Sequence, residues 1–138
     1  MRAVRSMTSE ERAENGKNIK MQGGYNCAQA VIKAYLDCID LDEKTLMEIS
    51  SGFGSGMGGM EGTCGAISGA VIVAGLLSNG NRTGSISKNI VSLFEAKSGA
   101  TICKNLKGIG TGKILCSCPQ CVYNAIVALE ESLANLNK

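Results

Sequence analysis

The chain has 138 residues, of which 44% are hydrophobic and 19% are charged, with a formal net charge of +2 and no histidine. This composition excludes a disordered chain, and the length predicts one globular domain, residues 1–138, whose hydrophobic core is large enough to be stable without disulfide bonds. The small charge and an aromatic content of only 4% argue against nucleic-acid binding, because single-strand binders need basic grooves and stacking platforms.

The N-terminal segment has no apolar stretch that marks secretion, and we expect residues 1–8 to be poorly ordered. The longest apolar run, residues 66–77, is shorter than the roughly 20 residues that span a bilayer. We therefore expect a cytoplasmic protein that contacts no membrane. Thiols stay reduced in that compartment, so the seven cysteines indicate metal or redox chemistry before structural disulfides.

Helical signals occupy almost the whole chain. They predict helices over residues 10–21, 26–39, 42–49, 63–78, 88–107 and 119–135. Ser9 can cap the first helix, Asn26 begins a capping-box pattern at the second, and Thr63 can cap the fourth, which is apolar all round. No pair of alternating strand patterns occurs. We expect an all-α, compact bundle of about five to six helices.

Basic residues are concentrated late in the chain. Between Arg82 and Lys113 there are six of them against a single acid, Glu95. The simplest interpretation is a solvated helix face followed by a loop. The alternatives are that these residues form a binding surface for an acidic redox partner, or that they neutralise the negative charge of a nearby metal centre.

Three cysteines fall at expected helix starts: Cys27, Cys64 and Cys118. A helix start offers unpaired N–H donors and the positive end of the helix dipole, so it stabilises a thiolate. A single cysteine in an apolar helix is more often a small buried hydrophobe, but here three share the same placement. Cys38 lies three helical turns after Cys27, too far along one helix to share a small site, and is expected to serve core packing.

Cys103 lies inside the expected fifth helix. If it converges with the other three, the set of four sulfurs could hold a 2Fe-2S or 4Fe-4S cluster or a structural zinc ion. Without histidine, a soft-metal site here must consist mostly of sulfur. Our leading interpretation is an iron–sulfur cluster that passes single electrons to a partner protein, and exposure to air could remove it.

The segment CPQC, Cys118 to Cys121, supports a different interpretation. C-x-x-C at a helix start is the arrangement with which dithiol oxidoreductases lower a thiol pKa, although no βαβ pattern surrounds it. A metal-free thiol–disulfide oxidoreductase would use Cys118 and Cys121, with Cys116 as a further resolving thiol.

Glycines flank the second of the helix-start cysteines. Gly58 and Gly59 lie in SGFGSGMGG, residues 51–59, and Gly65 follows Cys64. We expect them to let backbone N–H groups approach the sulfur and a centre held there. A flexible connector explains the segment equally well. A dinucleotide site is disfavoured, because the G-x-G-x-x-G pattern follows a helix rather than a strand.

Together these motifs resemble a known family. CGAISG, residues 64–69, reproduces the CGAxxG signature of the C_GCAxxG_C_C proteins, which are described as redox-active. NCAQAV, SGFGSGMGG, CKNLKG at Cys103 and the CPxxV helix start at Cys118 occur in the family's order. The resemblance covers nearly the whole chain from Tyr25 onward.

The resemblance implies a small helical domain with four characteristic cysteines, which correspond to Cys27, Cys64, Cys103 and Cys118. A similar domain occurs in split-Soret cytochromes, where it is associated with an iron–sulfur centre, but this chain lacks the heme-binding part. The other three cysteines look like additions to the family pattern. We expect an electron carrier or redox module more than a substrate-converting enzyme, and exposed apolar faces on so small a bundle predict a homodimer.

Overall fold

The computed structural model of the chain describes residues 7–136. The helices within this range are α1 Ser9–Gln22, α2 Cys27–Lys33, the 3-10 turn η1 Leu36–Cys38, α3 Glu43–Ser50, α4 Gly54–Met57, α5 Gly65–Leu77, α6 Thr83–Ser98, α7 Cys103–Lys107 and α8 Cys118–Leu136. Six α-helices have seven residues or more, and no strand forms in the described part. The predicted all-α bundle is confirmed.

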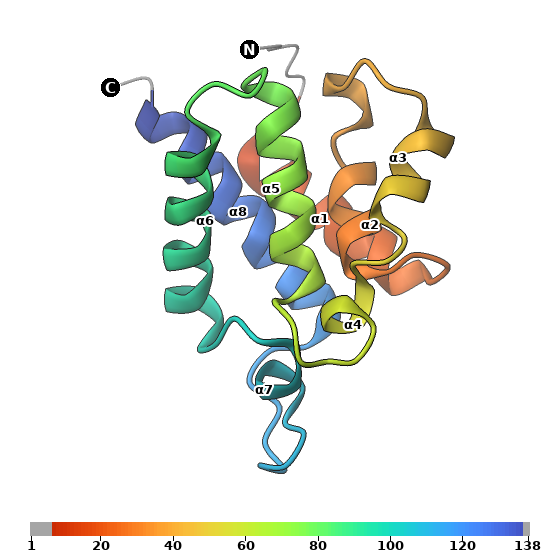
Figure 1. The fold of residues 1–138 in the computed structure, drawn as a ribbon, viewed down its shortest axis with the longest axis vertical. Helices are drawn as coiled ribbons and strands as arrows, with labels where there is room; N and C mark the ends of the chain where they lie inside the picture. Colours follow the sequence, from red (N-terminus) through yellow and green to blue (C-terminus); the bar gives the residue numbers. More distant parts are fainter. Residues whose placement is uncertain (1–6, 137–138) are drawn as a thin grey trace.

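Helix α5 runs through the middle of the bundle, with α6 on one side and α2 on the other (Figure 1). Its sequence GAISGAVIVAGLL has almost no polar face, and Ala66, Ala70 and Val73 are fully buried. A Cβ at Gly69 would lie 2.6 Å from the carbonyl oxygen of Ala28. Glycine at this position therefore allows the close approach of α2 that brings the start of α2 toward the start of α5.

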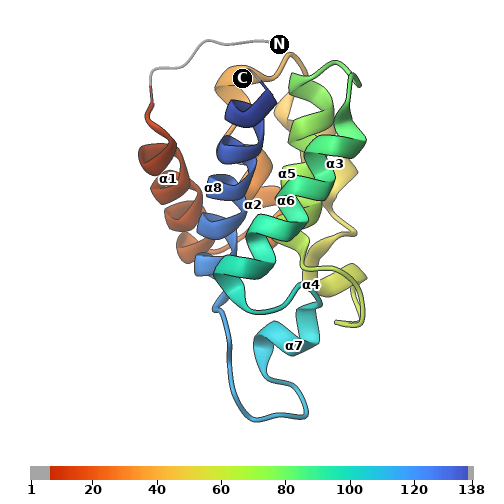
Figure 2. The ribbon, with the colours of Figure 1, turned by 90° about the vertical axis from the view of Figure 1, so that its left-hand side faces the viewer.

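Helix α7 and the loop that follows it lie below the ends of the long helices (Figure 2). The predicted helix over residues 88–107 is wrong as a single element, because α6 ends at Ser98 and α7 begins only at Cys103. Gly99 ends α6 in the left-handed conformation, with φ of +95°, and its N–H donates to the carbonyl of Glu95. This break positions α7 beneath the bundle.

Several predicted helix boundaries also shift. Thr8, not Ser9, caps α1 in a capping box with Glu11, whereas the predicted cap Asn26 is confirmed. The second helix stops at Lys33, well before its predicted end at residue 39. Of the segment 1–8, residues 1–6 lie outside the described residues.

A buried charge lies where helix α1 meets the turn after α2. Arg12 is fully buried, and its guanidinium donates to both carboxylate oxygens of Asp37, at 2.7 and 3.0 Å, and to the carbonyl of Ala34. It also stacks on the ring of Tyr35, 4.7 Å from the centroid. These partners compensate for the cost of removing the charge from water.

Among the described helices, none combines the length and the apolar character needed to cross a bilayer.

Candidate functional site

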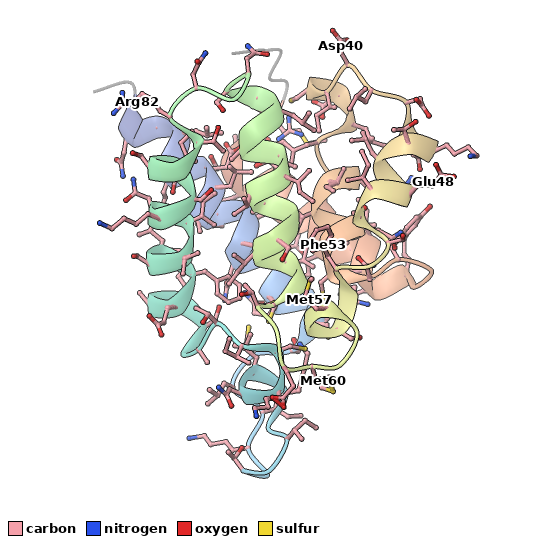
Figure 3. The ribbon with its side chains drawn as sticks, in the orientation of Figure 1. Asp40, Glu48, Phe53, Met57, Met60 and Arg82 are labelled. Atoms are coloured by element: carbon pink, nitrogen blue, oxygen red, sulfur yellow. The ribbon has the colours of Figure 1, made fainter. Side chains whose placement is uncertain are left out.

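The four cysteines of the sequence pattern line one cavity. Cys27, Cys64, Cys103 and Cys118 surround a volume of about 280 Å³ at the end of the bundle where α4 and α7 lie. Met60 lines it too, and Figure 3 shows this residue on the loop that passes in front of α7. Side chains separated by up to 91 positions in the sequence therefore meet at one place.

Each of these cysteines stands at a helix start. Cys27, Cys103 and Cys118 are the first residues of α2, α7 and α8, and Cys64 is the capping residue of α5. The predicted interior position of Cys103 is wrong, and so is the predicted cap Thr63. As a result, the positive ends of four helices carry the four sulfurs, and this environment favours thiolates.

Backbone hydrogen bonds hold Cys64 beside Cys103. The N–H of Cys64 donates to Thr101 at 2.8 Å, and the N–H of Cys103 donates to Gly62 at 3.0 Å. Between them, Thr63 and Ile102 form an isolated antiparallel bridge. This pairing explains why Thr63 does not cap α5, since its backbone is extended against the segment before α7.

The glycine-rich segment reaches the site through Gly56. A Cβ there would lie 2.5 Å from the Cβ of Cys103, and its φ of +58° is left-handed. Gly58 and Gly59 are exposed and have no neighbouring atoms within 4 Å of a built Cβ, whereas Gly65 lines the cavity. The sequence could not distinguish these positions, because which glycine touches a partner depends on how the loop closes.

Backbone N–H groups that favour a thiolate lie at the start of α5. The N–H groups of Ala66 and Ile67 lower the pKa of Cys64, and the N–H of Ile67 donates to the Cys64 carbonyl oxygen at 3.0 Å. The pKa of Cys64 is lowered to about 7, mainly by a hydrogen bond from Cys121 and further by these backbone donors, although burial opposes the shift.

The thiols of Cys118 and Cys27 interact directly. A hydrogen bond from Cys27 lowers the pKa of Cys118 to about 5 and raises that of Cys27, so Cys118 ionises first. Burial is the largest single effect on Lys107 and lowers its pKa, but the hydrogen bond to Cys118 and the negative charges of the nearby sulfurs together raise it. Cys118 is half-buried, while the other six cysteines are buried.

Two cysteines outside the set of four join the same network. Cys121 hydrogen-bonds with Cys116 and Cys64, which raises its own pKa, and it lowers the pKa of Cys116 to about 7. Cys118 interacts most strongly with Cys27, so the CPQC cysteines have different principal partners. Sequence reasoning missed this arrangement, because it depends on how α5 and α8 pack.

Cys38 lies at the opposite end of the molecule. It is 1% exposed within the core and lines a second cavity together with Asp40. Figure 3 shows Asp40 at the end of the bundle far from Met60. This placement agrees with the expected role of Cys38 in core packing.

The cavity is electropositive. Lys20 and Lys107 line it, and none of its lining residues is a carboxylate. Other basic residues of the late cluster form surface ion pairs instead, Lys97 with Glu131 and Lys104 with Glu61. Two of the six basic residues therefore form ion pairs at the surface, as the simplest interpretation predicts, whereas Lys107 faces sulfur.

The four sulfurs line the cavity but do not converge on a single metal-ion position. Within residues 7–136, no three cysteine or carboxylate side chains are grouped closely enough to hold one metal ion. In a cubane cluster each cysteine ligates a different iron, so the sulfurs stand further apart than they do around a single zinc ion. Four sulfurs are the number of ligands that such a cluster needs, and the nearby N–H groups and two lysines could donate hydrogen bonds to it.

Comparison with known proteins identifies one family. The family described as "Putative redox-active protein (C_GCAxxG_C_C)" matches residues 25–132. Searches of curated proteins and of solved structures gave no match. Because the matched region covers most of the chain, the chain belongs to the C_GCAxxG_C_C family.

Proposed function

We propose that the protein is a one-electron carrier that holds an iron–sulfur cluster at Cys27, Cys64, Cys103 and Cys118. The observation that carries this proposal is the convergence of four cysteine-bearing helix starts on one cavity. Four cysteine thiolates are the usual ligand set of 2Fe-2S and 4Fe-4S clusters. When bound, such a cluster accepts and releases single electrons.

The chain itself would supply the environment of the centre. The helix starts and the N–H groups of Ala66 and Ile67 favour negative charge on sulfur. Lys107 and Lys20 would offset the charge of a thiolate-bound centre, Met60 lines the cavity, and Gly56 packs against Cys103. Nearby positive charge and hydrogen bonds to sulfur are two of the properties by which a protein sets a reduction potential.

The test is to purify the chain without air and to count iron and acid-labile sulfide per chain. We expect both, with visible absorption, in the unchanged protein and in Cys38→Ser, the matched control at the far end of the bundle. Cys103→Ser should retain much less iron. An unchanged chain that binds no iron after anaerobic reconstitution would contradict the proposal, as would equal retention by both variants.

A second function, metal-free thiol–disulfide exchange, is favoured by one observation. Cys118 is half-buried at a helix start, and its interaction with the Cys27 thiol lowers its pKa to about 5. Its sulfur would attack a substrate disulfide and release one thiol, and Cys27 would then displace the second and close a Cys27–Cys118 disulfide. An external dithiol would reduce that disulfide again. The structure thus favours Cys27 over Cys121 as the resolving residue.

The two functions are separated by Cys103→Ser. This change removes one of the four sulfurs but leaves Cys118 and Cys27 in place. The iron-based carrier should lose its centre, whereas a dithiol enzyme should still reduce a test disulfide at close to its normal rate. Exchange activity that survives in the variant and in metal-free protein would favour the second function.

A further inference from the structure

Cys116 and Cys121 form a second thiol pair, which belongs neither to the four-cysteine set nor to the Cys27–Cys118 contact. Their exposed fractions are 6% and 0%. The two thiols share a hydrogen bond, and the Cys121 Sγ also donates to the Cys116 carbonyl oxygen at 3.7 Å. The pair flanks the start of α8, with Cys116 two residues before it and Cys121 in its first turn.

Polar donors surround the Cys116 sulfur. Asn124 Nδ2 lies 3.7 Å from it, and the hydroxyl of Ser98 and the thiol of Cys121 also donate to it. Asn124 and Ser98 are 8% and 5% exposed. Burying an amide and a hydroxyl costs free energy unless both find partners, and here they share this sulfur.

The orientation of Asn124 is fixed from its other end. Its Oδ1 accepts from Gln120 Nε2 at 2.9 Å, and its Nδ2 also donates to Ser98 Oγ at 2.9 Å. The amide therefore presents only its N–H groups to Cys116. In this arrangement Cys116 is the accepting, electron-rich sulfur. Cys121 lies beside it, donates to the Cys116 carbonyl oxygen and accepts from Lys107 Nζ at 4.0 Å.

We propose that Cys116 and Cys121 are a second, two-electron redox site that closes to an intramolecular disulfide when a low-molecular-weight disulfide oxidises it. This inference goes beyond the proposed function and needs none of the four cavity cysteines. In the first step, the Cys116 sulfur attacks one sulfur of R–S–S–R, the oxidant's S–S bond breaks, and RSH leaves with the proton of Cys116. The product is a mixed disulfide at Cys116.

In the second step, the Cys121 sulfur attacks the Cys116 sulfur. The bond to the oxidant's remaining half breaks, and a second RSH leaves with the proton of Cys121. Two protein thiols thereby lose two electrons and two protons, and the oxidant gains them as two thiols. Because Cys121 also hydrogen-bonds with Cys64, closing the disulfide takes one donor away from the cavity.

The experiment uses the full chain, reduced and then incubated with 2-hydroxyethyl disulfide. The thiols are trapped in acid, labelled with N-ethylmaleimide after unfolding, and mapped by mass spectrometry. Trypsin releases residues 114–138 as one peptide, since no lysine or arginine lies between Lys113 and Lys138. In Cys118→Ser this peptide contains only the two cysteines of interest.

We expect the oxidised Cys118→Ser peptide to carry no label and to weigh two hydrogens less than the dithiol. Adding Cys116→Ser should leave Cys121 fully labelled. In the unchanged chain, fragmentation should show that Cys116 and Cys121 lose their labels together, and this readout does not depend on the folding of a variant. Asn124→Leu should slow closure several-fold, because it removes the donor that orients Cys116.

Three results would overturn the proposal: both thiols staying labelled, a stable mixed disulfide at Cys116, or a crosslink from Cys121 to residues 45–82, the tryptic peptide that contains Cys64. None of these results depends on iron. A failure of this inference is therefore distinguishable from a failure of the proposed cluster.

Discussion

Replacing Gly56 by alanine tests the packing that holds Cys103 at the cavity. The added Cβ would lie 2.5 Å from the Cβ of Cys103 and 2.9 Å from the carbonyl oxygen of Gly62. Neither atom is the end of a flexible side chain, so the segment before α7 has to move. Gly58→Ala is the matched control, because it lies two residues away in the same loop, also has a positive φ, and meets nothing within 4 Å.

The two substitutions share one cost and differ in another. An alanine at φ of +58° or +85° costs about 1–2 kcal/mol, since its Cβ crowds the following carbonyl in left-handed backbone. Gly56→Ala adds a steric clash in a packed site, and overpacking costs about 1–3 kcal/mol. We therefore expect its free energy of unfolding to lie about 1–3 kcal/mol below that of Gly58→Ala.

Urea denaturation of the metal-free chain, followed by circular dichroism, measures the difference. With a slope of about 2 kcal/mol/M, the midpoint of Gly56→Ala should fall about 0.5–1.5 M below that of Gly58→Ala. The displaced Cys103 should also reduce the iron retained per chain in the Gly56 variant only. Coincident unfolding curves with equal iron retention would refute the proposed contact between the glycine-rich segment and Cys103.

Three further predictions concern separate parts of the molecule. Arg12 lowers the pKa of Asp37 through a hydrogen bond. The ion pair therefore stabilises the fold at pH values above the ordinary carboxyl pKa near 3.8, and this stabilisation is lost as the pH falls below that value. Asp37→Asn should lower the free energy of unfolding by about 1–3 kcal/mol at pH 7 and should weaken its dependence on pH in acid. In metal-free protein, iodoacetamide should modify Cys118 at a rate that rises through about pH 5, where its pKa lies, and a rise near pH 9 would contradict the contact with Cys27. Asn26→Ala removes the cap of α2 and the hydrogen bonds from Asn26 Nδ2 to the carbonyls of Ser50 and Ser51, so it should lower the free energy of unfolding by about 1–2 kcal/mol. Asn105→Ala, at an exposed position of α7, should lower it by less in the same urea titration.

Local signals allowed much of the fold to be predicted. The capping box of Asn26 and Gln29 is complete within four residues, so α2 begins where the sequence indicates. The apolar run after Cys64 also predicts the central helix correctly, since a helix without a polar face must be buried. These features depend on neighbours in the sequence and on little else.

The features that were missed depend on contacts across the fold. Gly99 can lie inside or at the end of a helix, and the bridge between Thr63 and Ile102 fixes the start of α7 at Cys103. Likewise, the CPQC spacing shows two thiols near each other in sequence, but helix packing pairs Cys118 with Cys27 and places Cys121 against both Cys116 and Cys64. Convergence of Cys27, Cys64 and Cys118 was inferred from their shared placement at helix starts, and Cys103 was added as a fourth sulfur on condition that it converged with them. Which thiol interacts with which could be learned only from the structure.

X-ray absorption at the iron edge of the anaerobically isolated chain tests the central claim most directly. The proposal predicts iron with sulfur alone in its first shell and a neighbouring iron beyond it, and it predicts that this signal disappears in Cys103→Ser but persists in Cys38→Ser. Iron bound through oxygen or nitrogen, or a chain that holds no iron under these conditions, would contradict the proposal that these four cysteines hold a cluster.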